Sequence, residues 1–388
     1  MTTLLAFILS APLQVAPTGP PLIAPEGPLQ RTESVRHRFT VTVTVNYSPA
    51  GTPSAPWTMP LVVNGPWSAI DTSGFEVTLI AGTDQLTEKG TELFEGPDAL
   101  GIGDISASIP AVQVWPLQVR VTAVATSWSS EFDDAAAIEI PWPSAWPPAV
   151  MPMLKPSVLI ESNSAIITDT VKELTKDDAK SVPPAQAAKL IVQDACKRFK
   201  VGQSHMSVGP QSQLRGIDVQ GAQAAATTGS GSSADLVCIC VAMLRAGGLP
   251  ARPVIGLGSA RWGGGNEYGI WAEVYLPGCG WTPFDPDVLR QQAIATLNPR
   301  TRWTGFGTLP QLQRRIALAW SFGPTVAATA FDSWAPWGWS RFAPEAAFPV
   351  AISAAGSVVT NAATGDSTSL SPQRPVPSSI RLERTSAP

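Results

Sequence analysis

The chain of 388 residues is poor in charged residues, in cysteine and above all in histidine, which occurs twice. Charged side chains make up 14% of the sequence, against about a quarter in typical proteins. The net charge is −4 and no run of Lys or Arg lies beside aromatic residues, so nucleic-acid binding is disfavoured. No segment approaches the roughly 20 apolar residues that a membrane-spanning helix requires.

The four cysteines are too few and too unevenly spaced for a disulfide framework; they are Cys196, Cys238, Cys240 and Cys279. No CxxC pair is present, so a zinc site has no support, and we expect neither a metal nor another cofactor. The sparse charge, with 38 Pro and 32 Gly, is typical of a loop-rich β-containing protein. A subunit packed inside an assembly would have the same composition.

The first residues, MTTLLAFILSAP, resemble a secretory signal peptide only in part. No Lys or Arg precedes the apolar stretch, and Pro12 and Pro17 follow the plausible cleavage sites, where proline blocks cleavage. We therefore expect this segment to stay attached. For the whole protein we favour an extracellular, cell-surface or virion location over the cytoplasm.

Composition and periodicity predict an α+β protein in four parts. Residues 1–34 are a Pro-rich extended arm, and residues 35–150 alternate as antiparallel strands do, which predicts a β-sandwich. Residues 151–300 combine helical and strand patterns in one domain. Residues 301–388 are a β-rich C-terminal region that ends in a Pro- and Ser-rich tail.

The sandwich prediction rests on period-2 runs. The first begins at Phe39, where apolar residues alternate with threonines, and weaker runs follow at 75–79, 117–121 and 137–140. The sequence PWPSAWPPAVMP then predicts a stiff linker to the next domain.

That next domain has two predicted helices. Apolar residues recur at helical spacing over 188–199, after Pro183 and Pro184, which suit a first helical turn. Residues 234–246 are apolar on nearly every side, so we expect a buried helix that ends at Gly247. Strands are predicted at 253–257, 270–276 and 281–284.

Three motifs follow one another in this domain. They are Leu-Arg-Ala-Gly-Gly-Leu-Pro-Ala-Arg at 244–252, Trp-Ala-Glu-Val at 271–274, and Gly-Trp-Thr-Pro-Phe-Asp-Pro at 280–286. In this order and spacing they resemble the core of the transglutaminase-like superfamily, which has a papain-type fold. The resemblance covers residues 155–290 or so, and it implies a domain whose active members use a cysteine, a histidine and an aspartate.

The resemblance places those three positions on Ser233, Gly269 and Asp285. Counting back from Arg245 puts the cysteine position on Ser233, and counting back from Trp271 puts the histidine position on Gly269. In the family, the cysteine gains thiolate character at a helix N-terminus, the histidine is the base and the aspartate orients it. Of the three, Asp285 alone keeps the family's residue.

The missing cysteine and histidine predict a pseudoenzyme, because losing the nucleophile or base of such a unit costs on the order of 10⁶ in rate. His37 lies at the start of the first predicted strand. His205, in the loop before the buried helix, is the one candidate base, and we expect it not to approach Ser233. Asp235 matches a frequent acidic position of the family and is expected to cap the helix.

Three functions are compatible with these residues. The first is a catalytically inactive structural or interaction protein, such as a subunit of a virion, an appendage or another large assembly. It would contact other protein subunits through the arm before Arg31 and the tail after Leu370, and both would contact their own domains little. The second is a divergent hydrolase or acyltransferase that uses Ser233 with His205. The third is a ligand-binding module in the old substrate cleft near Ser233, Gly269, Trp271 and Asp285.

The sequence also predicts the reactivity of two cysteines. Cys238 and Cys240 have apolar neighbours on the buried helix, so they should be unbridged and should react slowly with an alkylating reagent in the native protein. Mass spectrometry after timed alkylation measures this rate. Rapid stoichiometric labelling, or a bridge between the two, would contradict the prediction.

Overall fold

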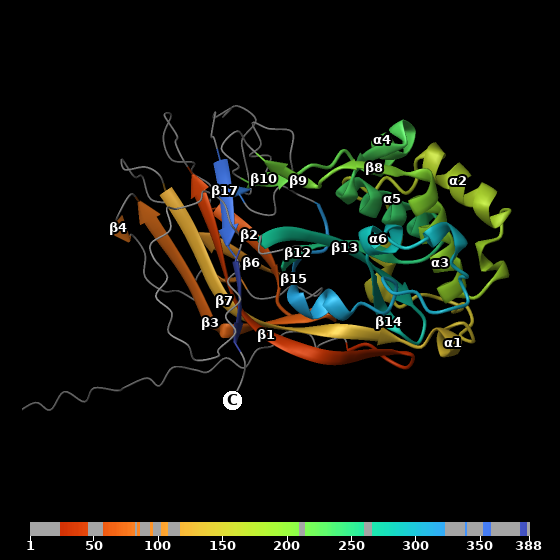
Figure 1. Ribbon diagram of the computed structural model, residues 1–388, viewed down its shortest axis with the longest axis horizontal. Helices are drawn as coiled ribbons and strands as arrows, with labels where there is room; N and C mark the ends of the chain where they lie inside the picture. The colour runs from red at the N-terminus through yellow and green to blue at the C-terminus, as the bar shows by residue number, and fades with distance from the viewer. Residues whose placement is uncertain are drawn as a thin grey trace, which may run out of the picture.

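The computed structural model describes residues 24–45, 57–81, 84–85, 94–95, 102–107, 117–208, 214–259, 266–322, 338–339, 352–357 and 381–385. Helices and sheets are mixed, and the described strands form one six-stranded sheet, two four-stranded sheets and two short strand pairs. Figure 1 shows the four-stranded sheet of β12 to β15 between a group of helices and the two sheets built mainly from the N-terminal part of the chain.

The N-terminal part contributes two antiparallel sheets. The six-stranded sheet has the order β17-β1-β7-β3-β4, with β18 also paired to β1: β17 (Ile352–Ser357), β1 (Leu29–Val45), β7 (Leu117–Phe132), β3 (Ser68–Ala81), β4 (Asp84–Gln85) and β18 (Arg381–Thr385). The second sheet has the order β16 (Gly338–Trp339), β2 (Trp57–Val62), β6 (Ile102–Ala107) and β5 (Phe94–Glu95). That these two sheets make a β-sandwich stays a prediction.

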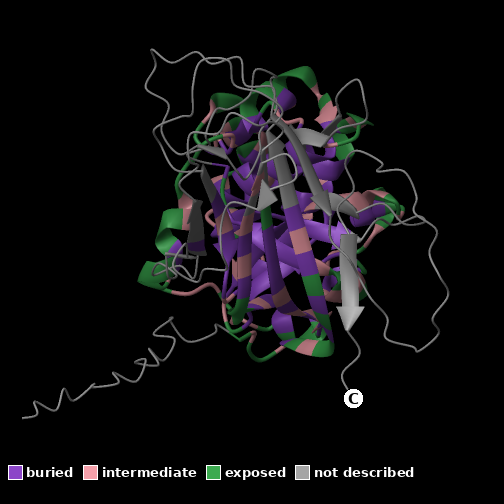
Figure 2. Ribbon diagram, turned by 90° about the vertical axis from the view of Figure 1, so that its left-hand side faces the viewer, coloured by how far each residue is buried: buried purple, intermediate pink, exposed green. Residues whose placement is uncertain are grey.

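Alternation along the strands explains why these segments form a sheet. Phe39 pairs with Ala123, and Val41 pairs with Val121, which also pairs with Val77 on the other side. All five side chains are fully buried, so one face of the sheet is apolar. Figure 2 shows buried residues along the long strands, interrupted by intermediate and exposed ones, as in the alternation from Val35 to Val41 of β1.

The central sheet and the helices hold the region of the three motifs. The antiparallel order is β14 (Gly280–Phe284), β13 (Asn266–Leu276), β12 (Ala251–Ser259) and β15 (Arg315–Ala319). The helices are α2 (Ala165–Thr175), α3 (Pro184–Arg198), α4 (Ala222–Thr228), α5 (Ser233–Ala246) and α6 (Pro286–Arg290). The helices and strands predicted for this region from periodicity are thereby confirmed.

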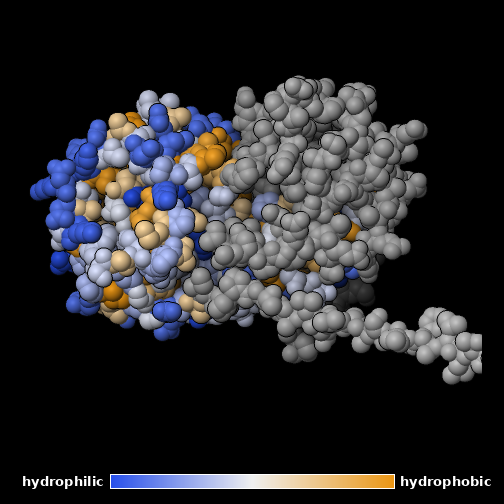
Figure 3. Space-filling model, turned by 180° about the vertical axis from the view of Figure 1, so that it is seen from behind, coloured by the Kyte–Doolittle hydropathy of each residue, from blue (hydrophilic) through white to orange (hydrophobic). Residues whose placement is uncertain are grey.

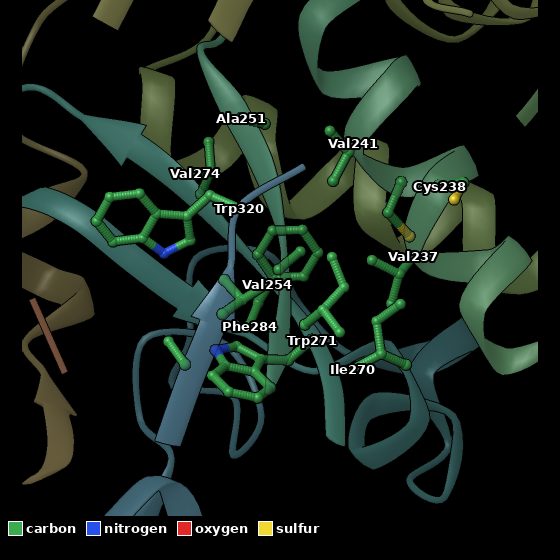
Figure 4. Close-up of a cluster of buried hydrophobic side chains, with 14 of the residues drawn as sticks. Val237, Cys238, Val241, Ala251, Val254, Ile270, Trp271, Val274, Phe284 and Trp320 are labelled. Carbon is green, nitrogen blue, oxygen red and sulfur yellow. The ribbon is translucent and has the colours of Figure 1, made fainter. Parts of the chain in front are cut away.

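Helix α5 is the centre of this region. Every residue from Ser233 to Arg245 is buried, as its apolar sequence predicts. Figure 4 shows Val237 and Val241 of this helix directed at the strands, with Ile270 of β13 close to Val237. Gly247 follows as C-cap, and Gly248 takes a φ of +81°, a conformation that glycine adopts without strain.

One predicted strand is wrong. Residues 137–140 were expected to be extended, but α1 (Asp134–Ala137) and a turn occupy this place. The Asp133 side chain accepts a hydrogen bond from the Ala136 N–H at 3.1 Å and so caps a short helix of alanines. Four alternating residues before a proline are too weak a signal to outweigh that cap.

The expectation that arm and tail make few contacts with the rest of the chain is wrong for their described parts. The Glu26 N–H donates to the Cys279 carbonyl at 3.2 Å, and Leu29 is buried and pairs with Phe132. At the other end of the chain, β18 pairs with β1. The remaining arm and tail residues lie outside the described part.

The C-terminal region does contain strands, and the described ones join sheets formed by other segments. Strand β15 extends the central sheet, β16 pairs with β2, and both β17 and β18 pair with β1. The four domain boundaries remain predictions. No helix among the described residues is long and apolar enough to cross a membrane.

A buried ion pair joins α1 to α3. Lys189 Nζ donates to Asp134 Oδ1 and also to the Thr301 carbonyl at 2.7 Å, and it lies 5.1 Å from the centre of the Trp303 ring. Lys189 is 1% exposed and Asp134 is 6% exposed. Burial raises the pKa of Asp134 and lowers that of Lys189, so each charge depends on the other.

Removing one partner of this pair should therefore cost more than removing both. We expect Lys189→Met to lower the free energy of unfolding by about 3–5 kcal/mol, because it leaves the Asp134 carboxyl buried without its cation. Adding Asp134→Asn should recover more than half of that loss. Urea denaturation of the single and double variants measures both values, and a double variant less stable than Lys189→Met would contradict the interpretation.

Candidate functional site

The start of α5 is fixed by a capping box. The Ser232 hydroxyl accepts from the Asp235 N–H at 3.2 Å, and the Asp235 carboxylate accepts from the Ser232 N–H at 2.9 Å. The same carboxylate accepts from the N–H groups of Gln220 at 2.7 Å and Gly221 at 3.2 Å. Asp235 thus caps the helix, as predicted, and Ser233 is held as its first residue, where the helix dipole favours negative charge.

His205 contacts Ser233, so the expectation that the two lie apart is wrong. Its Nδ1 is 2.8 Å from Ser233 Oγ. The cause is a parallel pairing of β8 (Lys200–Gln203) with β11 (Ser230–Ser232), in which Gln203 lies opposite Ser232. Because His205 comes two residues after Gln203 and Ser233 directly follows Ser232, this register brings their side chains together.

Hydrogen bonds through Asp218 hold the His205 loop in place. The Asp218 N–H donates to the His205 carbonyl at 2.7 Å, and its carboxylate accepts from Gln203 Nε2 at 2.6 Å. The Asp218 carbonyl in turn accepts from the Ser232 hydroxyl at 2.6 Å. These hydrogen bonds therefore connect the backbone segment that carries His205 to the backbone segment that carries Ser233.

Both carboxylate oxygens of Asp285 form hydrogen bonds with groups other than a histidine. Its Oδ1 accepts from the N–H groups of Asp287 at 2.9 Å and Val288 at 3.1 Å, which caps α6. Its Oδ2 accepts from Arg315 Nη2 at 2.5 Å. Asp285 is 4% exposed and Arg315 is 15% exposed, so this ion pair is largely shielded from water. The aspartate of the motif has become the partner of an arginine from β15.

Gly269 lies on β13, opposite Gly256 of β12. A Cβ at Gly269 would lie 3.3 Å from Cζ3 of Trp271, and one at Gly256 would lie 2.7 Å from Cη2 of the same ring. The ring is 1% exposed, and Arg315 Cζ is 5.3 Å from its centre. Gly269 brings no titratable group to the site, and the indole of Trp271 lies next to its position.

Asp287 is a site residue that the sequence reading missed. Burial raises the pKa of Asp287, and the neighbouring Asp285 carboxylate adds to this, whereas His205, Ser233 and Arg290 lower it. Its carboxylate therefore lies near the Ser233–His205 pair. No family motif marks position 287; its proximity to Asp285 in the sequence was the one available signal.

The predicted positions thus fall into two adjoining groups. Ser233 contacts His205, and Asp287 lies near this pair, while Asp285 contacts Arg315, which lies beside Trp271. Asp287 joins the groups because its N–H donates to Asp285. Gly269 belongs to the second group through the ring of Trp271.

The cysteines do not substitute for the missing thiol. Cys238 and Cys240 are buried and unbridged, as predicted. Burial raises the pKa of both thiols well above its ordinary value, which disfavours the reactive thiolate. Within the described ranges, no group of three or more His, Cys, Asp or Glu side chains could hold a metal ion.

Comparison with known proteins agrees with the motifs. Residues 169–286 match the Transglutaminase-like superfamily. No curated protein matches the sequence. Among solved structures, a candidate cysteine protease from Cytophaga hutchinsonii is 15% identical over 75% of this chain and 83% of its own, with a TM-score of 0.48. The periplasmic domain of TgpA from Pseudomonas aeruginosa is 14% identical over 66% of this chain and 91% of its own, with a TM-score of 0.29.

The proximity of Ser233 to Asp287 has a measurable consequence. Because Ser233 lowers the pKa of Asp287, Ser233→Ala should raise that pKa further. Carboxyl ¹³C NMR across a pH titration measures the change. Ser181→Ala, which removes a hydroxyl bonded to the Asp178 carbonyl, is the control and should leave the Asp287 titration unchanged. An unchanged or lower pKa in Ser233→Ala would show that Ser233 does not stabilise the Asp287 carboxylate.

Proposed function

Because residues 169–286 form a transglutaminase-like domain, we propose that the domain catalyses acyl transfer with the Ser233 hydroxyl in place of a cysteine thiol. The observation that carries this proposal is the 2.8 Å contact between Ser233 Oγ and His205 Nδ1. It lies within the roughly 2.6–3.2 Å over which a side chain can exchange a proton with a nucleophile. The substrate class is an ester or an amide.

The surroundings of Ser233 support this chemistry. As first residue of a 14-residue helix, it places the oxygen of a tetrahedral intermediate near the positive end of the helix dipole. His205 contacts its hydroxyl, so a proton acceptor lies in reach without a histidine at 269. The hydrogen bonds of Asp218 and Asp235 keep this geometry fixed before a substrate arrives, which lowers the cost of reaching the transition state.

Labelling by a fluorophosphonate probe, together with hydrolysis of nitrophenyl esters and glutamine amides, tests the proposal. We expect the wild-type protein to be labelled at Ser233 and to hydrolyse at least one ester faster than background. Ser233→Ala should lose both signals, while Ser181→Ala, at the exposed end of a short 3-10 helix, should keep them. Absence of labelling and turnover in the wild-type protein, or their persistence in Ser233→Ala, would refute the proposed activity.

A second candidate is the catalytically inactive structural or interaction protein. Two features favour this candidate. Asp285 is bonded to Arg315, and position 269 is a glycine, so neither position can act as it does in the family's catalytic unit. A role in a virion, an appendage or another assembly, outside the cytoplasm, would suit the sparsely charged composition. It would be the better account if the wild-type protein neither reacts with the probe nor turns over substrate.

Two observations weigh against the second candidate. The described parts of arm and tail pair with strands of the same chain, so they do not need a partner subunit to form their strands. Figure 3 shows a described surface that is mostly hydrophilic, with separate apolar areas. Large exposed apolar side chains among the described residues are Met151, Val158 and Ile166. Isolated apolar side chains of this kind are ordinary on a protein surface.

A further inference from the structure

We infer that Ser232 is a positioning residue for the reaction: through the backbone of Asp218, its hydroxyl proton holds His205 in hydrogen-bond contact with Ser233. The inference rests on the acyl-transfer function proposed above, because it assigns the group that keeps the nucleophile and the histidine together. Ser232 acts through Asp218 and His205 and has no part in the bonds that form or break. This role is separate from the place of Ser232 in the capping box.

Two short strand pairs meet at the site. In the first, β8 pairs with β11, which ends at Ser232. In the second, β9 (Met206–Val208) pairs with β10 (Leu214–Ile217). His205 directly precedes β9 and Asp218 directly follows β10, and the Asp218 N–H donates to the His205 carbonyl at 2.7 Å. The nucleophile therefore follows the first pair, while the histidine lies at the end of the second.

The Ser232 hydroxyl joins these two strand pairs. It donates to the Asp218 carbonyl at 2.6 Å. Gln203, which lies opposite Ser232 on β8, donates from Nε2 to the Asp218 carboxylate at 2.6 Å. Asp218 is thus held by one side chain from each strand of the first pair, and it holds His205 in turn. A shift of Asp218 would change the distance between His205 and Ser233.

The two roles of Ser232 use different parts of one hydroxyl. A hydroxyl has one proton to donate and lone pairs that accept. In the capping box, Ser232 Oγ accepts from the Asp235 N–H at 3.2 Å, which uses a lone pair. The proton has two acceptors in reach, the Asp218 carbonyl at 2.6 Å and Asp235 Oδ2 at 3.2 Å. Bonds of this type span roughly 2.5–3.0 Å, so the proton belongs to the contact with Asp218.

Burial makes this contact hard to replace. Ser232 is fully buried, so water does not compete for its hydroxyl. Without that hydroxyl, the Asp218 carbonyl loses its donor, whereas the Asp235 carboxylate still accepts from the backbone N–H groups of residues 220, 221 and 232. Loss of the Ser232 proton should therefore displace His205 more than it displaces the start of α5.

Ser232→Gly tests the inference, because glycine is tolerated at an N-cap with little loss of stability but cannot donate to Asp218. The chain has two histidines, so long-range ¹H–¹⁵N spectra contain two sets of ring signals, and the set absent from His205→Asn belongs to His205. We expect Ser232→Gly to shift the His205 Nδ1 signal and to leave the His37 signals in place. For an ester substrate, kcat should fall by about 10–10²-fold while KM changes less than about twofold.

Three further variants isolate the hydroxyl proton. Ser232→Thr keeps both the proton and the lone pairs, so it should restore the His205 signal and kcat. Gln203→Ala removes the other side-chain bond to Asp218 without altering the capping box, and it should shift the same signal. Ser164→Gly is the matched control: Ser164 is the N-cap of α2 and makes no side-chain cap hydrogen bond, so both readouts should stay as in the wild type.

A Ser232→Gly protein with a lower melting temperature but an unchanged His205 signal and kcat would overturn the inference, because Ser232 would then act as a cap alone. If Ser232→Gly does not fold, Gln203→Ala decides, and an unchanged His205 signal in that variant overturns the inference as well. Absence of turnover in the wild-type protein refutes the acyl-transfer function. The NMR comparison does not depend on turnover, so the two failures are distinguishable.

Discussion

The buried carboxylate of Asp235 is the constraint on which the rest of the site depends. It is fully buried, and its hydrogen bonds to Ser232, Gln220 and Gly221 join the start of α5 to the segment that precedes α4. A buried carboxylate without such donors would cost several kcal/mol, so its position is narrowly defined. Because Ser233 follows directly after Ser232, the position of its hydroxyl is set by this capping box and by the buried helix behind it.

A serine hydroxyl at this position needs different neighbours from a cysteine thiol before it can act as a nucleophile. A thiol near a helix N-terminus can ionise with the help of the dipole alone, whereas a serine hydroxyl keeps its proton at any physiological pH. A serine variant of the site therefore depends on an acceptor in direct contact with the hydroxyl. His205 provides that contact from the loop after β8, a segment that does not carry the family's histidine position.

The sequence predicts well the helix and strands that surround the site. The helix start, the three strands after it and the positions of Ser233 and Asp285 follow from motifs and from 3.6- and 2-residue periods, which apolar burial imposes directly. Contacts between polar side chains that are distant in the chain produce no such periodicity in the sequence. His205 reaches Ser233 through a parallel pairing of two short polar strands, and nothing in their composition indicates that register. Arg315 lies beyond the last motif, on a strand whose neighbour cannot be read from spacing.

The side chain of Arg315 connects the edge of the central sheet to the last motif. It starts on β15 opposite Gly258 and ends on Asp285, beside the ring of Trp271. The ion pair thus joins the aspartate of that motif to a strand outside the motifs, and a side chain at position 269 would meet the same indole ring.

The pairing of β1 with later strands determines when the six-stranded sheet can be completed during synthesis. Arg36 lies opposite Thr385, and Thr40 lies opposite Ser357, so one edge of this early strand is covered by segments that come much later in the chain. Until those segments are synthesised, β1 presents unpaired N–H and C=O groups along that edge, which are a template for pairing with another chain. Synthesis of β17 and β18 therefore closes the six-stranded sheet, and a product truncated before them should be more prone to aggregation.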